Sequence, residues 1–439
     1  MRALLHQIAR GAAWKLGADL LGRLLQYVLL WAAARSLGVA DFGDFTFALS
    51  VGLMLAQVAD FGLQLFVQRE LARLVIPGAI SRPYFSDDAA ASRLIGGGLL
   101  IKAVLSVVSL AFMVVLVALE PVGNKGALLL VGLSMVLGTG LEYLSYCFRA
   151  LGRLKNEAMA TLLARSVNLV LGVGLLVAGA GVWGLAIAGN IAMLAAIGFN
   201  YSRLVSYVRP AWHLDWGYWR RVLGQPTAIG IGVVFSIISF RVDNLLIPPI
   251  AGREALGLYN VAYKLFEPSQ VLPGALLAAT FPLISQAALG RERTSLRKLL
   301  AHNLTLLLGL GGGVTLFLLI FAGPVIGLLY GEEYALSVPI LQILALACVP
   351  MFLNYALTHV LIAMDRPRLY ATFTAAVIFV NLAVNLALLP VIGVQGAAWA
   401  TVGTEFALFV LCAWAVARHI NVPVTTPAEP AEPYWESPL

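Results

Sequence analysis

The sequence predicts an all-α polytopic membrane protein with about twelve transmembrane helices, arranged as two parallel six-helix lobes around a central cavity. Three observations support this fold class. Of the 439 residues, 60% are hydrophobic and only 12% are charged, whereas soluble domains carry about 25% charged residues. Long apolar runs recur along the chain, and the second half repeats landmarks of the first.

The apolar runs are long enough to cross roughly 30 Å of hydrocarbon, which takes about 20 helical residues. The first half contains six of them, at 12–38, 42–66, 94–119, 127–149, 158–180 and 182–205. The second half contains six more, at 225–250, 256–287, 299–329, 336–363, 370–389 and 395–418. We therefore expect six spans in each half.

Three sequence landmarks occur twice in the same order, at offsets of 214, 213 and 212 residues. The pairs are Leu37–Ala48 with Ala251–Ala262, Ala150–Lys155 with Ala363–Arg368, and Gly181–Ala186 with Gly393–Ala398. Internal repeats of this kind are typical of transporters. Because each half has an even number of spans, both halves begin on the same side of the membrane and the repeats are parallel.

Lys and Arg residues are concentrated on one side of this topology. The connections on the side of the N-terminus contain 21 of them, whereas the opposite side contains three, Arg35, Lys125 and Arg253. The positive-inside rule therefore places both termini and the connection between the halves in the cytoplasm. The net charge of +7 reflects this topology, and we expect no nucleic-acid partner.

These boundaries define an N-terminal lobe at 1–205, a cytoplasmic interfacial linker at 206–224, a C-terminal lobe at 225–418 and a cytoplasmic tail at 419–439. Trp212, Trp216 and Trp219 recur at helical spacing in the linker, which predicts an amphipathic helix at the inner interface. The tail is rich in Pro and Glu, so we expect it to be disordered.

Four basic residues within the predicted spans are candidates for lining a cationic, substrate-binding cavity: Arg23, Arg241, Lys264 and Arg165. A charge near the bilayer centre costs a few kcal/mol, so such side chains face a bundle interior or an aqueous cavity. Arg23 lies about 11 residues, or roughly 16 Å, from the inner edge of its span. Snorkelling to the headgroups is the alternative for Arg165, and it is what we expect for Lys102.

Six carboxylates are candidates for ion coupling or for pairing with these cations: Asp19, Asp60, Glu142, Asp243, Glu267 and Glu405. Asp19, Arg23 and Gln26 share one helix face at i, i+4 and i+7. Mutual neutralisation of Asp19 and Arg23 is therefore the alternative to a substrate role. A desolvated carboxylate can exchange a proton as a cavity opens to either side, which would supply a coupling mechanism.

Motifs for catalysis are missing from the sequence. It contains no P-loop spacing and no His or Cys cluster with the spacing of metal ligands. We expect no enzymatic activity, no cofactor and no metal site.

Six segments carry a family resemblance. In the first half they are Ala34–Ala48, Ala59–Leu63 and Arg69–Arg73, and in the second half Val242–Leu246, Gly257–Tyr263 and Val394–Ala400. Together they resemble the polysaccharide repeat-unit (Wzx-type) flippases, a polysaccharide transporter family within the multidrug/oligosaccharidyl-lipid/polysaccharide exporter superfamily. The resemblance extends to about residue 418.

The resemblance implies a bacterial inner-membrane transporter with both termini in the cytoplasm. Its substrate would be an O-antigen or exopolysaccharide repeat unit linked through pyrophosphate to a polyprenyl lipid. Alternating access would move this lipid from the cytoplasmic to the outer leaflet for surface-polysaccharide assembly. Membrane lipids, a polysaccharide polymerase and chain-length proteins are the implied partners. Arg23, Arg241 and Lys264 would then line the cavity that accepts the pyrophosphate.

Two other functions stay open. A cation-coupled multidrug exporter of the same superfamily predicts a cavity dominated by carboxylates and aromatic residues. A membrane-embedded polysaccharide polymerase or ligase predicts a large external loop carrying Arg and His residues. The predicted outer connections are all short, which disfavours the polymerase or ligase.

Overall fold

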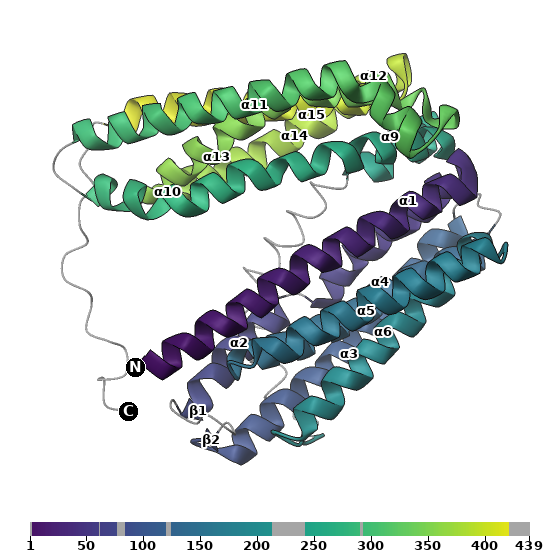
Figure 1. The fold of residues 1–439 in the computed structure, drawn as a ribbon, viewed down its shortest axis with the longest axis vertical. Coiled ribbons are helices and arrows are strands. Elements are labelled where there is room, and N and C mark those ends of the chain that lie inside the picture. Colours follow the sequence, from purple (N-terminus) through teal and green to yellow (C-terminus); the bar gives the residue numbers. More distant parts are fainter. Residues whose placement is uncertain are drawn as a thin grey trace. The chain divides into compact units, whose positions relative to one another are not determined.

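The computed structural model describes residues 2–60, 62–76, 84–119, 124–212, 242–289 and 293–420. It divides into two compact units, Met1–Gly257 and Leu258–Leu439, and the described parts of both are almost entirely α-helical (Figure 1). The predicted linker at 206–224 and the predicted tail lie largely outside the described residues, so the lobe boundaries stay a prediction.

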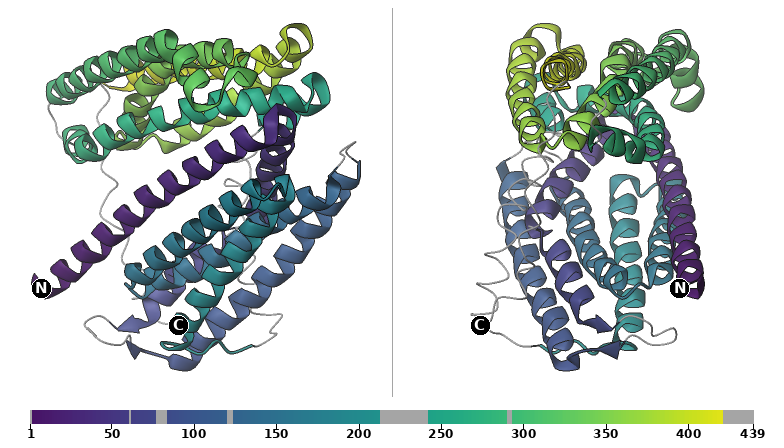
Figure 2. Two further views of the ribbon diagram at one scale, coloured as in Figure 1. Left: turned by 45° about the vertical axis from the view of Figure 1, so that its right-hand side comes forward. Right: turned by 90° about the vertical axis from the view of Figure 1, so that its left-hand side faces the viewer.

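The first unit is built on one long, kinked helix. This helix, α1 (Arg2–Asp60), contains the first predicted span and the second as far as Asp60, and its backbone leaves the helical region at Gly38, with φ 75° and ψ 172°. The remaining elements are α2 (Leu63–Leu74), β1 (Val75–Ile76), β2 (Tyr84–Phe85), α3 (Asp88–Leu119), α4 (Lys125–Ala150), α5 (Leu154–Val177), α6 (Gly181–Val205) and a short helix at Val242–Ala251. Both views of Figure 2 show α3 to α6 running roughly side by side.

The second unit has more interruptions in its helices. Its elements are α9 (Arg253–Phe266, which begins in the first unit), η1 (Glu267–Gln270), α10 (Val271–Leu289), α11 (Arg293–Leu329), η2 (Glu332–Tyr334), α12 (Ser337–Leu346), α13 (Cys348–Ala363), α14 (Pro367–Ile392) and α15 (Gln395–His419). The predicted span at 256–287 is broken by the short 3₁₀ helix η1, which contains Pro268. Proline removes a backbone donor and clashes with the preceding turn, which explains the break.

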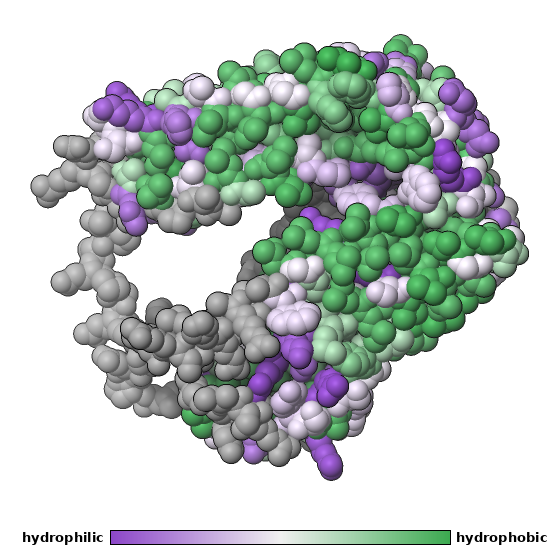
Figure 3. Space-filling model, viewed as in Figure 1, coloured by the Kyte–Doolittle hydropathy of each residue, from purple (hydrophilic) through white to green (hydrophobic). Residues whose placement is uncertain are grey.

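A polytopic membrane fold is confirmed by the length and composition of the helices. Nine helices among the described residues are long and apolar enough to cross a membrane. Large hydrophobic side chains are exposed along them, for example Val107 and Phe112 of α3 and Ile320 of α11. In Figure 3 hydrophobic side chains cover much of the visible face of the helices. The count of twelve spans stays a prediction, because most of the span at 225–250 lies outside the described residues.

The internal repeat extends to the backbone conformation. All three landmarks place a residue with positive φ at equivalent positions: Gly38 and Gly252 (75° and 90°), Gly152 and Asp365 (67° and 58°), and Gly181 and Gly393 (54° and 62°). At the second landmark the hydrogen bonds also match. The amide of Arg153 donates to Phe148 at 2.8 Å, and that of Arg366 donates to Leu361 at 2.9 Å. Both α4 and α13 therefore end in the same left-handed cap.

The two left-handed caps predict how substitutions at Gly152 and Asp365 change the free energy of unfolding. Because a left-handed backbone costs a non-glycine residue about 1–2 kcal/mol, Gly152→Ala is expected to lower the free energy of unfolding by about 1 kcal/mol. Asp365→Gly is expected to raise it by a few tenths of a kcal/mol, since Gly also gains entropy when unfolded. Denaturant titration in detergent micelles measures both. Gly309→Ala, in the middle of α11 with open space at its Cβ position, is the control and should not destabilise. Equal effects at 152 and 309 would contradict the cap assignment.

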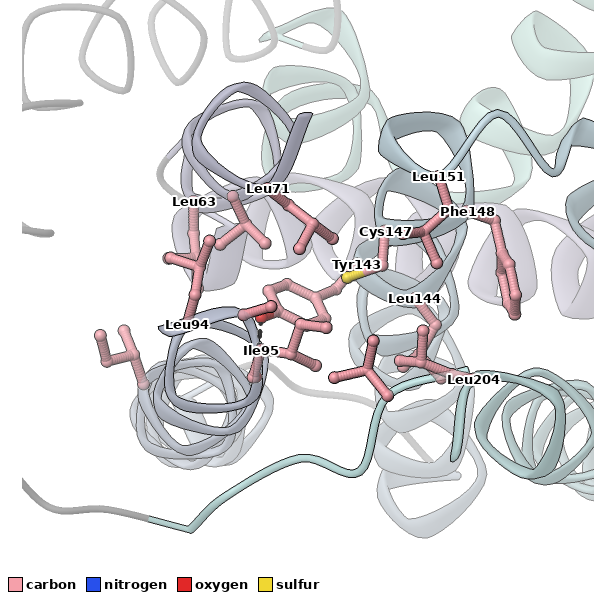
Figure 4. Packing of buried hydrophobic residues seen from close by; sticks show 14 residues of the cluster. Leu63, Leu71, Leu94, Ile95, Tyr143, Leu144, Cys147, Phe148, Leu151 and Leu204 are labelled. Carbon is pink, nitrogen blue, oxygen red and sulfur yellow. Dashed lines mark hydrogen bonds between the residues drawn. The ribbon is translucent and has the colours of Figure 1, made fainter. Parts of the chain in front are cut away.

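A buried hydrophobic cluster packs the amphipathic helix α2 against α3 and α4 of the first unit. Leu63 and Leu71 of α2 pack with Ile95 of α3 and Tyr143 of α4 (Figure 4). The Tyr143 hydroxyl donates a hydrogen bond of 2.9 Å to the Ile95 carbonyl, which satisfies the one polar atom of that side chain. After α2, β1 pairs with β2 in an antiparallel ladder, with Val75 opposite Phe85 and Ile76 opposite Tyr84.

Candidate functional site

Packing of α1 on α5 places one of the four predicted cations, Arg165, against the residue that precedes another, Arg23. Gly22 is buried against α5, and a Cβ at this position would lie 3.4 Å from Cγ of Arg165 and 3.7 Å from Cγ2 of Thr161. These distances are ordinary van der Waals contacts, so α1 and α5 pack closely at Gly22. Arg23, the next residue of α1, is exposed. Among the residues that the structure describes, Arg23 has no ion-pair partner, so its charge is available to a ligand.

A buried ion pair lies deeper in the same unit. Nζ of Lys102 on α3 is 3.0 Å from Oδ1 of Asp60 at the end of α1, and each side chain is only 4% exposed. The expectation that Lys102 snorkels to the headgroups is therefore wrong. Snorkelling requires an open path to the interface, whereas the carboxylate of Asp60 holds this ammonium inside the unit.

Glu142 connects the ion pair with Arg165. Its carboxylate, on α4, interacts electrostatically with Asp60, Lys102 and Arg165. Three helices and the end of α1 thus contribute charges to one group, which we call the first-unit charge cluster: Asp60, Lys102, Glu142 and Arg165. Each cation in the cluster has a carboxylate nearby, which offsets part of the cost of placing it within the spans.

Asp19 belongs to a second group of charges. It pairs with Lys15, so the alternative in which Asp19 and Arg23 neutralise each other is not what the structure shows. Nζ of Lys15 also lies 3.0 Å from Oε1 of Glu157.

Glu157 is the residue that sequence reasoning missed. Its side chain is 2% exposed, and Nη2 of Arg149 lies 2.7 Å from Oε1. Nε of Arg149 makes two further contacts of 3.0 and 3.1 Å to the same carboxylate. Arg149 and Glu157 flank the tight turn at Gly152, so antiparallel α4 and α5 bring them face to face. An Arg in the last turn before a helix-ending glycine and a Glu in the first turn of the next helix were the available signal.

The second unit holds two separate polar groups. At the junction of α9 and η1, Nζ of Lys264 lies 2.6 Å from Oε2 of Glu267. On α15, Glu405 is held by an amide: Nδ2 of Asn354 donates to its Oε2 at 2.8 Å and to its backbone carbonyl at 2.9 Å. Asn354, like Glu157, was not singled out from the sequence.

The remaining candidates lie near the edge of the described region. Arg241 lies outside the described residues, so its predicted role stays a prediction. Asp243 is half-buried on the short helix Val242–Ala251. Its neighbour Asn244 is buried, and its Nδ2 donates a hydrogen bond of 2.6 Å to Ser50 of α1.

The membrane carboxylates differ in what surrounds them. Glu157 accepts from two cations, Glu142 lies among several charges, and Glu405 accepts from the Asn354 amide. Of these three carboxylates, Glu405 is the one whose side chain is held by a neutral donor. No group of His, Cys, Asp or Glu side chains in the described part of the chain has an arrangement that could hold a metal ion.

Two family models match the chain. The model described as "Polysaccharide biosynthesis protein" matches residues 8–288, and the MatE model matches residues 228–387. Two relatives from Haloferax volcanii are similar to the chain. The probable low-salt glycan biosynthesis flippase Agl15 is 24% identical over 159 residues, and the probable flippase AglR is 27% identical over 168 residues. Each match covers 36% of this chain and 34% of the relative, so the chain spans about a third of each relative's length.

Solved transporters share the fold. An inward-facing multidrug resistance MATE family transporter of the MOP superfamily matches 92% of this chain and 96% of its own, with a TM-score of 0.73 and 17% identity. The lipid II flippase MurJ, in an inward closed conformation, matches 92% and 87%, with a TM-score of 0.70 and 14% identity. At these identities the similarity shows the architecture alone.

Proposed function

The chain belongs to the polysaccharide biosynthesis protein family, and we propose that it flips polyprenyl-pyrophosphate-linked oligosaccharides from the cytoplasmic to the outer leaflet by alternating access. The observation that carries the proposal is that two arginines lie within the spans of two packed helices, Arg165 of α5 against Gly22 of α1 and the exposed Arg23 at the next position of α1. A pyrophosphate that links a lipid to a sugar is a compact dianion, and guanidinium groups bind phosphate oxygens through paired hydrogen bonds. The flippase names of the two similar relatives support the same function.

The lipid part of the proposed substrate needs no enclosed site. A polyprenyl chain can stay in the hydrocarbon of the bilayer while the headgroup crosses. Moving the chain from lipid into the protein would release little free energy, because both surroundings are apolar. We further propose that the protein lies in a bacterial inner membrane with both termini in the cytoplasm. A polymerase and chain-length proteins would consume its product.

A multidrug exporter is the second candidate function. The MatE match to residues 228–387 and the MATE transporters of similar fold favour it. An exporter of cationic drugs needs carboxylates that accept the drug, and Arg23 and Arg165 would repel it. The charge of the two arginines therefore favours the flippase.

Reconstitution tests the proposal. Purified protein in liposomes should move a fluorescent undecaprenyl-pyrophosphate disaccharide to the opposite leaflet, where a membrane-impermeant quencher detects it. Liposomes that contain no protein set the background rate. The proposal is supported if the protein raises the rate well above this background. Export of ethidium without movement of the lipid would instead establish the multidrug exporter.

Glu405 is our candidate for proton coupling. Glu405→Gln is expected to remove most of the stimulation that an imposed pH gradient gives to lipid flipping, because the amide cannot exchange a proton. The Asn354 contact could still form with the Gln side-chain oxygen, so folding should be kept. The measurement compares flipping rates with and without the gradient. Glu332→Gln, at an exposed residue of η2, is the matched control and should respond like wild type. Full gradient stimulation in Glu405→Gln would exclude this role.

A further inference from the structure

Helices α1 and α5 of the first unit carry the same short motif, an arginine followed three residues later by a side-chain amide. On α1 the two residues are Arg23 and Gln26, and on α5 they are Arg165 and Asn168. Residues three apart lie on one face of a helix, and the rise of 1.5 Å per residue places each amide about 4.5 Å beyond its arginine. Each helix therefore presents a cation and, nearly one turn further along, a neutral hydrogen-bonding group.

Two glycine contacts show how the motifs line up. A Cβ at Gly22 of α1 would lie 3.4 Å from Cγ of Arg165, and a Cβ at Gly172 of α5 would lie 2.7 Å from Cδ1 of Leu29. Going from the first contact to the second, the residue numbers of both helices rise by the same amount, so α1 and α5 run in the same direction. The two arginines therefore lie at about one height along the helix pair, and the two amides lie at the next.

Neither amide has a hydrogen-bond partner among the residues that the structure describes. Oδ1 of Asn168 is a buried atom without a partner, and its Nδ2 and the amide of Gln26 make no hydrogen bond either. Both side chains are partly exposed. In contrast, Nδ2 of Asn190 on α6 donates to the carbonyls of Leu130 and Ala186, at 2.7 and 2.8 Å. Because an unpaired polar atom lowers stability, the two free amides are better suited to a ligand than to packing.

The nearest hydroxyl on the α4 side of Asn168 is already engaged. A Cβ at Gly189 of α6 would lie 4.0 Å from Oδ1 of Asn168 and 3.3 Å from Oγ of Ser134 on α4. This hydroxyl donates to the carbonyl of Val131 at 2.7 Å, so its one proton is used within its own helix. The helix packing therefore brings Asn168 close to a polar neighbour without satisfying it.

We infer that Gln26 and Asn168 bind the sugar that is joined to the pyrophosphate, beyond the two arginines that bind the pyrophosphate itself. This inference rests on the proposed function. A sugar ring is uncharged and carries hydroxyl groups that both donate and accept hydrogen bonds. The Gln26 amide offers a donor and an acceptor to such a group, and Nδ2 of Asn168 offers a donor. A few polar groups at fixed positions are what orients a ligand in a binding site.

A pair of lipids tests the inference. One is undecaprenyl pyrophosphate, and the other is the same lipid carrying the disaccharide; the binding of each is measured with the protein in nanodiscs. We expect wild-type protein to bind the disaccharide lipid about tenfold more tightly, as two or three neutral hydrogen bonds would give. Gln26→Leu with Asn168→Leu should remove this difference and leave the binding of undecaprenyl pyrophosphate unchanged.

The outcomes separate this inference from the proposed function. Equal binding of the two lipids by wild-type protein, or an undiminished preference in the double variant, would overturn the sugar site and leave the pyrophosphate site intact. Binding of neither lipid by wild-type protein would contradict the proposed function, and this inference with it.

Asn190→Leu is the matched control, because it removes an amide of the same unit whose nitrogen is bonded within the protein. It should keep the preference for the disaccharide lipid but lower the thermal denaturation midpoint. Asn168→Leu should not lower the midpoint, because it breaks no hydrogen bond. A midpoint lowered as much in Asn168→Leu as in Asn190→Leu would show that Asn168 serves packing and would overturn its assignment to the sugar.

Discussion

Replacing Arg23 by glutamine is expected to slow flipping of the undecaprenyl-pyrophosphate disaccharide by about 10- to 100-fold. A hydrogen bond to a charged group contributes about 1.5–3 kcal/mol, and each 1.4 kcal/mol is a factor of ten. Arg23 is exposed, so its replacement leaves no buried partner unsatisfied and the fold should be kept. The flipping rate in proteoliposomes, normalised to the amount of folded protein, measures the effect.

Three variants locate the effect in the charge. Arg165→Gln should slow flipping to a similar degree, because its side chain packs against Gly22 next to Arg23. Arg23→Lys should keep part of the activity, since an ammonium retains the charge but not the planar fork of donors. Arg93→Gln, at an exposed residue near the start of α3, should flip at the wild-type rate. Wild-type flipping in both Arg23→Gln and Arg165→Gln would contradict the pyrophosphate site and favour the multidrug exporter.

Breaking the buried ion pair is expected to have the largest effect on stability. Lys102→Met leaves Asp60 as an uncompensated carboxylate in the interior of the first unit, which should lower the free energy of unfolding by about 3–5 kcal/mol. Protein yield and denaturant midpoint in detergent measure the loss. The double variant, Lys102→Met with Asp60→Leu, should recover most of it, because a hydrophobic pair of similar volume carries no desolvation cost.

Lys125→Met is the control for this pair. Lys125 is exposed at the start of α4 and donates to the carbonyl of Ala118 at 2.9 Å, and changes at exposed positions usually stay within about 0.5 kcal/mol. If Lys102→Met unfolds with the same midpoint as Lys125→Met, the pair is not a stabilising element. If the double variant is no better than the single one, the loss has a cause other than the unpaired charge.

The fold class and the repeat could be predicted from the sequence because both leave local signals. Apolar runs mark helices without reference to their neighbours, and the turns at Gly152 and Asp365 follow from residues that end a helix locally. The same holds for the kink at Gly38, where a glycine separates two apolar runs. The break in the predicted span at 256–287 also has a local signal, which is Pro268. The break was not predicted, because apolar residues continue on both sides of this proline.

The partners of the charged residues could not be predicted in the same way. Helical spacing permits Asp19 to pair with either Lys15 or Arg23, and in the structure it pairs with Lys15, which also contacts Glu157 of another helix. The partner of Lys102 lies 42 residues away, at the end of α1. Spacing within one helix carries no information about which helices touch, so long-range pairs emerge only from the packing.

We propose that cations within the first unit bind the pyrophosphate of a lipid-linked sugar. This is tested by comparing the binding of two lipids that differ only in the link between polyprenyl chain and disaccharide, one pyrophosphate and one uncharged ether. Wild-type protein is expected to bind the pyrophosphate lipid at least about tenfold more tightly. Arg23→Gln with Arg165→Gln is expected to remove this preference. Equal binding of the two lipids by the wild type, or an unchanged preference in the double variant, would rule out the pyrophosphate site.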